Sequence, residues 1–204
     1  MSIKAILFDL DGVLVDACEL HYKSLNLALL DYGCFAIQRN DHEVLYNGLP
    51  TKMKLQMMDL TEEAIEAISE KKQEFTISAI EELINQDRVK ITMMQDLIDA
   101  GYRIACVTNS IRKTAVLMLE CAEISEYIEQ IISNEDVTLP KPRPEGYLRA
   151  MIELGVGPKE CLIVEDSDKG FAAANAASAT VWRVKDPSEV TSENIMKVLE
   201  ECKS

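Results

Sequence analysis

The chain has 204 residues, of which 48% are hydrophobic, and it carries a formal net charge of −14 at pH 7. This length and apolar content are enough for one domain with a sizeable core, or for one domain with a smaller appendage. The negative charge argues against nucleic acid or an anionic membrane surface as a partner, because such contacts depend on Lys and Arg meeting phosphate.

The six cysteines include no C-x-x-C pair, so we expect reduced thiols rather than disulfides or a zinc site. Acidic residues interrupt the N-terminal segment by Asp9, which argues against a secretory leader. No apolar run approaches the roughly 18 residues that a membrane-spanning helix requires. We therefore expect a soluble, cytoplasmic protein without a membrane partner, present as a monomer or a small homo-oligomer.

The first predicted element is a strand over residues 4–10, where the sequence reads KAILFDL. Residues 16–85 contain no convincing strand pattern. They are typical of helices instead, at 17–33, around 41–46, at 51–59 and at 61–84. Thr61 precedes acidic residues that suit the first turn of the last of these helices. A helical block after the first strand predicts a small, all-helical cap domain.

After this block, strands alternate with helices. Strands are predicted at 103–109, 129–133, 161–166 and 180–184, and helices at 110–122, 144–155, 168–177 and 188–202. The strands lack polar alternation, which is typical of a parallel sheet covered on both faces. We expect an α/β fold: a doubly wound, Rossmann-like parallel sheet formed by residues 1–15 and 86–204, with residues 16–85 inserted as the cap domain.

Polar residues follow most of the predicted strands. They are Asp9, Asp11 and Gly12, then Thr108, Asn109 and Ser110, then Lys141, and finally Glu165 and Asp166. Ligands of an open parallel sheet bind beyond the carboxyl ends of its strands, so we expect these residues at one rim. If the first strand stays straight, the side chains of Asp9 and Asp11 point the same way.

These residues have compatible chemistry. Carboxylate oxygens without a nearby His or Cys favour Mg²⁺ over zinc. The Lys141 ammonium and the Thr108 hydroxyl could hold a phosphate. Gly12 allows a sharp turn and lets backbone N–H groups approach a ligand.

Four segments, DLDGVLVD, VTNS, KPRP and VEDSDKG, resemble in order and spacing the four motifs of the haloacid dehalogenase (HAD) superfamily. The resemblance covers essentially the whole chain, including the helical insertion after the first motif. Within the superfamily the chain is similar to the phosphatase and phosphomutase branch, which includes β-phosphoglucomutase and phosphoglycolate phosphatase.

The resemblance implies that Asp9 is a nucleophile that forms an aspartyl-phosphate, and that Asp11 is the general acid and base. It implies a Mg²⁺ ion held by the Asp9 carboxylate, the Asp11 main-chain carbonyl and Asp166, with Glu165 as a direct or water-bridged ligand. Lys141 would offset the repulsion between the anionic nucleophile and an anionic substrate.

Phosphate binding is expected from the neighbours of these residues. Thr108 and the N–H groups near it, including that of Asn109, would steady the oxygens of the transferring phosphoryl group, together with the turn at Gly12. Asp11 disfavours a dehalogenase, because the dehalogenases of this superfamily lack that second aspartate.

The segment NGLPTKMKL, Asn47 to Leu55, resembles the loop that reaches from cap to core in this family. Counted from Gly48, sugar-phosphate mutases have an Arg where this chain has Thr51, followed by Lys52. The missing guanidinium weakens the mutase interpretation, although Lys52 could supply one positive charge. His21 resembles a cap histidine linked to proton handling in β-phosphoglucomutase, but its place on a helix favours an ordinary helix-face histidine with a satisfied hydrogen bond.

We therefore predict a Mg²⁺-dependent phosphatase that hydrolyses a small phosphorylated metabolite through an aspartyl-phosphate. Two alternatives stay open at this point. One is a sugar-phosphate mutase similar to β-phosphoglucomutase, and the other is a non-catalytic, phosphate-binding regulatory protein on the same scaffold.

Overall fold

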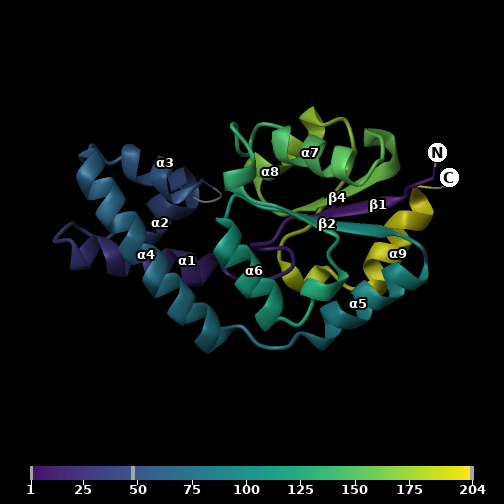
Figure 1. The fold of residues 1–204 in the computed structure, drawn as a ribbon, viewed down its shortest axis with the longest axis horizontal. Helices are drawn as coiled ribbons and strands as arrows, with labels where there is room; N and C mark the ends of the chain where they lie inside the picture. The colour runs from purple at the N-terminus through teal and green to yellow at the C-terminus, as the bar shows by residue number, and fades with distance from the viewer. Residues whose placement is uncertain (1, 47–48, 203–204) are drawn as a thin grey trace. The chain divides into compact units, whose positions relative to one another are not determined.

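The structure is a computed structural model that describes residues 2–46 and 49–202 (Figure 1). The chain forms two compact units. Met1–Asp16 and Asn85–Ser204 make up the first, called here the sheet unit, and Ala17–Ile84 make up the second, called the helical unit. Within the described residues, no helix is both long enough and apolar enough to cross a membrane.

The sheet unit contains a parallel sheet whose strands lie in the order β3-β2-β1-β4-β5. The strands are β1 (Ala5–Phe8), β2 (Arg103–Val107), β3 (Gln130–Ile132), β4 (Cys161–Glu165) and β5 (Thr180–Arg183). In the central strand, Phe8 pairs with Cys106 of β2 and with Val164 of β4. The carboxyl ends of these three strands are therefore level, at one edge of the sheet.

Helices cover both faces of this sheet (Figure 1). They are α5 (Arg88–Asp99), α6 (Arg112–Cys121), α7 (Glu145–Glu153), α8 (Asp168–Ala176) and α9 (Ser192–Glu201). Short 3₁₀ turns occupy Ser125–Tyr127, Asn134–Asp136, Pro158–Glu160 and Pro187–Glu189. Helices α7 and α8 cover one face, where Tyr147, Met151 and Ala173 pack on Leu7 and Ile163.

The other face is covered by α5, α6 and α9 (Figure 1). Every residue of β1 and β4 is buried. Their runs without polar alternation therefore match burial on both faces. The predicted doubly wound α/β sheet with a helical insertion is confirmed.

Helix α5 is absent from the elements that the sequence analysis predicts. Its buried positions, Lys90, Met93, Met94 and Leu97, follow the helical spacing, and Asp87 caps its first turn by accepting hydrogen bonds from the amides of Val89 and Lys90. A lysine occupies the first of these buried positions, which hides the apolar stripe. The Lys90 ammonium donates to the carbonyls of Pro187 and Val190, at 2.6 and 2.9 Å, so it ties α5 to the chain before α9.

The helical unit consists of α1 (Cys18–Asp31), α2 (Arg39–Asp41), a π-helical turn (His42–Tyr46), α3 (Thr51–Gln56) and α4 (Glu62–Leu83). Helices α1 and α4 pack against each other along their apolar faces. Leu25, Leu29, Leu55, Ile65 and Ile68 are among the residues of its core. Thr61 caps α4 by accepting from the Ala64 amide, as its sequence context predicts.

Candidate active site

The carboxyl edge of the sheet brings the ends of β1 and β4 together. Strand β1 ends at Phe8, and the next residue, Asp9, donates its amide hydrogen to the carbonyl of Val164 at 3.0 Å. Glu165 closes β4, so Asp9 and Glu165 leave adjacent strands at the same level. The register of a buried parallel sheet thus places two acids, far apart in the sequence, side by side.

A buried ion-pair network joins these two acids to Lys141. The Lys141 ammonium donates to Asp9 Oδ1 at 2.7 Å and to Glu165 Oε1. Exposed fractions are 7% for Asp9, 7% for Lys141 and 0% for Glu165. Burial alone would lower the pKa of Lys141, but the carboxylates of Asp9 and Glu165 raise it above its ordinary value, so the ammonium stays charged.

A third carboxylate completes an oxygen-rich cluster. Ligand atoms of Asp9, Glu165 and Asp166 all lie within 4.8 Å of one another. Burial, followed by the charge of Glu165, raises the pKa of Asp166 to about 6. Burial also raises the pKa of Asp9, and Lys141 only partly opposes this. Three carboxylates against one ammonium leave a net negative charge, which favours a cation between them.

Asp166 gives a direct test of whether a divalent cation fits the cluster. Its Oδ1 atom is buried and has no hydrogen-bond partner among the described residues. A buried carboxylate oxygen without a donor is costly, and a hard cation satisfies it. Because the donor set consists of carboxylate oxygens, the residues present fit a hard divalent cation such as Mg²⁺, Ca²⁺ or Mn²⁺.

Two glycines make room for the carboxylates. A Cβ atom on Gly12, which has φ = +90°, would lie 2.3 Å from Asp166 Oδ2. A Cβ atom on Gly170, in the first turn of α8, would lie 1.9 Å from Glu165 Oε1. Any side chain at either position would displace an acid of the cluster, so the close approach requires glycine at both positions, and at Gly12 the positive φ favours it as well.

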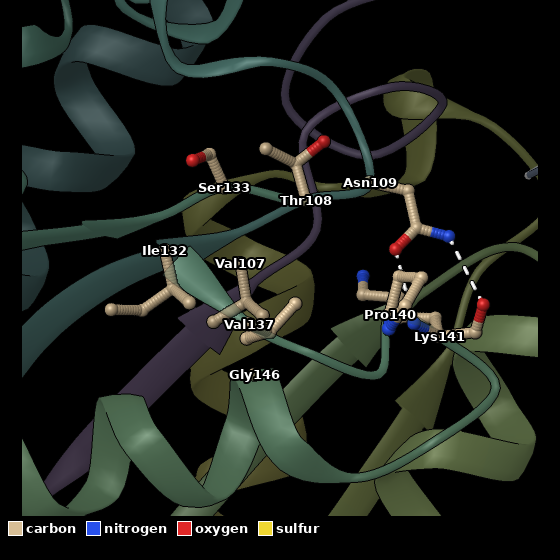
Figure 2. Close-up of a pocket in the computed structure, with 9 residues that line it drawn as sticks. All are labelled: Val107, Thr108, Asn109, Ile132, Ser133, Val137, Pro140, Lys141 and Gly146. Atoms are coloured by element: carbon tan, nitrogen blue, oxygen red, sulfur yellow. Dashed lines mark hydrogen bonds between the residues drawn. The ribbon is translucent and has the colours of Figure 1, made fainter. Parts of the chain in front are cut away.

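Asn109 holds Lys141 in place through the backbone (Figure 2). Its side-chain oxygen accepts from the Lys141 amide at 3.1 Å, and its amide nitrogen donates to the Lys141 carbonyl at 3.2 Å. Thr108 lies at the end of β2, is 4% exposed, and its hydroxyl accepts from the Ser110 amide at 2.9 Å. These residues line a cavity of about 10 Å³. It has room for about one water molecule and is too small for a substrate.

Asp11 is not one of the three residues whose ligand atoms lie within 4.8 Å of one another, although its charge acts on Asp9 and Asp166. The strand ends before it, and a turn closed by the Gly12 amide and the Val15 carbonyl, at 2.8 Å, carries the chain back. The condition under which Asp9 and Asp11 would point the same way, a straight strand through both, is therefore not met. The Asp11 carboxylate instead accepts a hydrogen bond from the Ser110 hydroxyl at 2.8 Å.

The predicted residues of the helical unit lie in two settings. His21 on α1 shares a 3.2 Å hydrogen bond between its Nδ1 atom and the Lys72 ammonium on α4. Lys52 is 65% exposed in its side chain and lies 3.6 Å from Glu62, whereas its neighbour Lys54 is buried. Asn47 and Gly48, from which the mutase pattern was counted, lie outside the described residues.

Sequence reasoning missed three residues at these places: Tyr147, Gly170 and Lys72. The Tyr147 hydroxyl donates to Glu165 Oε1 at 2.5 Å, and burial raises its pKa well above the ordinary value. Gly170 had a usable signal, because a glycine inside a helix is costly and indicates a close approach. Ser110 stands in the quoted VTNS segment without an assigned role, and Lys72 and Tyr147 read as ordinary helix residues.

Comparisons with known proteins agree with this geometry. The family model described as haloacid dehalogenase-like hydrolase matches residues 6–184. A pyrophosphatase, PpaX, from Bacillus velezensis is 30% identical over 187 residues, which cover 90% of this chain and 85% of that protein.

Two solved structures extend the comparison to the fold. A β-phosphoglucomutase from Clostridium difficile superposes with a TM-score of 0.84 at 24% identity, covering 98% of each chain. CbbY from Rhodobacter sphaeroides, solved with phosphate, superposes with a TM-score of 0.81 at 25% identity, covering 89% of this chain and 85% of that one.

Proposed function

Because the chain belongs to the haloacid dehalogenase-like hydrolase family, we propose that it is a Mg²⁺-dependent phosphatase that hydrolyses a small phosphorylated compound through an aspartyl-phosphate. The observation that carries the proposal is the buried cluster of Asp9, Glu165 and Asp166 beside the Lys141 ammonium. This cluster brings together the proposed nucleophile, Asp9, three carboxylates that could hold a cation, and the positive charge of Lys141.

In the proposed mechanism, an Asp9 carboxylate oxygen attacks phosphorus and the bond to the leaving oxygen breaks. Asp11 gives a proton to that oxygen, then takes one from the water that hydrolyses the aspartyl-phosphate. The Lys141 ammonium binds a phosphoryl oxygen and reduces the repulsion between Asp9 and the substrate. Bound Mg²⁺, held by Asp9, Glu165, Asp166 and the Asp11 carbonyl, supplies further neutralisation of phosphoryl charge.

The residues at the end of β2 are proposed to orient the phosphoryl group. The Thr108 hydroxyl and the backbone amides at Asn109 and Gly12 would donate to its oxygens. Asn109 would act twice, because its side chain also holds the backbone of Lys141. The proposed roles of these residues therefore depend on one another.

The helical unit is proposed to act as a cap that selects the leaving group. Its basic residues His21, Lys52 and Lys72 would favour an anionic compound. The similarity to a pyrophosphatase over 90% of the chain makes inorganic pyrophosphate a compound to test beside sugar phosphates and phosphoglycolate. The free thiols of the chain support a cytoplasmic location.

The test is a panel of phosphorylated compounds incubated with the full chain and Mg²⁺. Released phosphate reports phosphatase activity. Isomerised sugar phosphate that depends on a bisphosphate primer reports the mutase alternative. Asp9→Asn should lower turnover by at least about a thousandfold, because it removes the nucleophile. Turnover that survives this change would refute the assigned mechanism.

Asp99→Asn is the matched control, because Asp99 is exposed at the end of α5. It should leave turnover within about twofold of the unchanged chain. Tight binding of phosphate and Mg²⁺ without turnover of any compound would instead favour the regulatory protein over the enzyme.

A further inference from the structure

Tyr147 contacts Glu165 and Lys141, the two charged residues that lie beside Asp9. It lies on α7 and is 0% exposed. Its hydroxyl donates to Glu165 Oε1 at 2.5 Å, and the Lys141 ammonium lies 4.8 Å from the centre of its ring. One aromatic side chain thus contacts an acid from β4 and the lysine from the loop after β3.

Packing alone does not account for the hydroxyl of Tyr147. The ring lies in an apolar cluster with Ala150, Met151 and Leu154, which a phenylalanine would fill equally well. A buried hydroxyl costs free energy unless it finds a hydrogen-bond partner. The one it finds is a carboxylate, and hydrogen bonds to an ionised group are the stronger kind.

The hydrogen bonds of Glu165 show what the hydroxyl changes. Glu165 Oε1 accepts from both Tyr147 and Lys141, and Oε2 accepts from the Ser167 hydroxyl at 3.3 Å. Lys141 is shared between Glu165 and Asp9. Because Tyr147 supplies an uncharged donor to Glu165, the ammonium does not have to satisfy that carboxylate alone. It stays beside Asp9, where the phosphoryl group would arrive.

We propose that Tyr147 is a positioning residue whose hydroxyl fixes the Glu165 carboxylate for the divalent cation and keeps the Lys141 ammonium beside Asp9. The inference rests on the proposed phosphatase function for the meaning of the site. Removing the hydroxyl frees the Glu165 carboxylate to rotate and shifts Lys141 towards it, so both cation binding and turnover should suffer.

The experiment compares Tyr147→Phe with the unchanged chain. Mg²⁺ affinity is measured by calorimetry without substrate, and kcat and KM are measured on the best compound of the panel. Loss of a partner that orients a metal ligand lowers affinity or activity by about ten- to a hundredfold. We expect weaker Mg²⁺ binding and a lower kcat within that range, KM within about threefold, and a thermal midpoint within about 3 °C.

Tyr127→Phe is the matched control, since it also removes a phenolic hydroxyl in the sheet unit. That hydroxyl only accepts from the Gln95 side chain, at 3.1 Å. The control should leave Mg²⁺ affinity and kcat within about twofold. The proposal is overturned if Tyr147→Phe behaves like the control, or if it lowers the thermal midpoint while Mg²⁺ affinity and kcat stay unchanged.

Calorimetry separates this proposal from the proposed function. If the chain hydrolyses none of the compounds but binds Mg²⁺ more weakly after Tyr147→Phe, the phosphatase assignment is refuted and the role of Tyr147 in fixing Glu165 is supported. If both forms hydrolyse phosphate esters equally well and bind Mg²⁺ with equal affinity, the proposed function is supported and the role of Tyr147 is refuted. An unchanged chain that binds no Mg²⁺ overturns the positioning role as well.

Discussion

The two units bury charge of opposite sign. In the sheet unit, three carboxylates form a cluster beside one ammonium, which pairs with two of them, and the acids predominate. In the helical unit, the ammonium groups of Lys54 and Lys72 are buried, each 8% exposed, whereas burial lowers the pKa of His42 to about 4 and leaves its ring neutral near pH 7. The carboxylate cluster of the sheet unit favours a cation, and the buried ammonium groups of the helical unit favour an anion.

The clusters also differ in how tightly their members depend on one another. The Lys141 ammonium pairs with Asp9 and Glu165, and Asn109 holds the Lys141 backbone. Removing the charge of Lys141 would therefore leave two buried carboxylates without a counter-charge. In the helical unit, the Lys72 ammonium shares a 3.2 Å hydrogen bond with His21 Nδ1. Burial alone therefore does not determine how much a charged side chain contributes to the free energy of unfolding. Substitutions in both units test this difference.

The largest expected difference comes from one substitution made in each unit. Lys141→Met leaves Asp9 and Glu165 buried without a counter-charge, and should lower the free energy of unfolding by about 3–5 kcal/mol. Lys71→Met in the helical unit removes an exposed ion pair with Glu74, at 2.9 Å, and should cost less than about 1 kcal/mol. Urea unfolding in the presence of EDTA measures both. Equal losses would contradict the difference between the two pairs, and Lys113→Met on the exposed face of α6 is the control.

A pair of glycine substitutions isolates the close approach in the sheet unit. Gly→Ala inside a helix is normally favourable by about 1 kcal/mol. At Gly170 the new Cβ atom would lie 1.9 Å from Glu165 Oε1, so overpacking should reverse the sign, with a loss of about 1–3 kcal/mol and weaker Mg²⁺ binding. Gly157→Ala, with its nearest atom at 3.5 Å, is the control. A stabilised Gly170→Ala protein would refute the packing argument.

The two clusters should respond to acid in opposite directions. Burial, and then Glu165, raise the folded pKa of Asp166 to about 6 from 3.8, so the folded state takes up this proton first as the pH falls through 6. Burial, and then the charge of Lys54, lower the folded pKa of His42 to about 4 from 6.5, so the unfolded state takes up that proton first below 6.5. Acid therefore stabilises the metal-free fold through Asp166 and destabilises it through His42.

Each contribution is about 1 kcal/mol between about pH 7.5 and about pH 5.5. Urea unfolding of EDTA-treated protein across this range measures their sum. Asp166→Asn should make the loss of stability on acidification steeper, and His42→Gln should make it shallower. Two variants with identical pH profiles would show that neither pKa is displaced as described.

The smallest effect is expected at Lys52. Its side chain is exposed and paired only with Glu62, at 3.6 Å, so its truncation should leave stability unchanged. If Lys52 attracts the substrate, Lys52→Ala raises KM by about two- to fivefold, and Lys72→Met raises it more, with kcat less affected. Steady-state kinetics at low and high salt measure this. A Lys52→Ala protein with unchanged KM at low salt would remove Lys52 from the site.

The sequence was most informative where strands end. Buried parallel strands have a fixed register, so the polar residues that follow them lie at one edge of the sheet. The family that the four motifs indicated is confirmed by the family model. The roles proposed for Asp9, Lys141 and Glu165 stay predictions until tested. The turn at Gly12 was readable as a turn, but the hydrogen bond from Ser110 to the Asp11 carboxylate was not, because side-chain direction changes once a strand ends.

Contacts made between helices were not readable in the same way. Tyr147 and Lys72 reach their partners from helix faces, where spacing fixes a direction along one helix but not the neighbour that it meets. Helix α5 was missed because Lys90 occupies a buried position that usually holds an apolar residue. Its ammonium is satisfied by two backbone carbonyls, which only the tertiary structure reveals.

The place of β1 in the sheet has a consequence for how the chain acquires its structure on the ribosome. Ala5 pairs with Arg103 and with Cys161, so this strand has no sheet partner until long after it is translated. At synthesis rates of about 5–20 residues per second, β1 waits roughly 5–20 s for β2. The helical unit draws its core from Ala17–Ile84 alone and can collapse during that delay. Nascent chains should therefore be protease-resistant over the helices of the helical unit before β1 is protected.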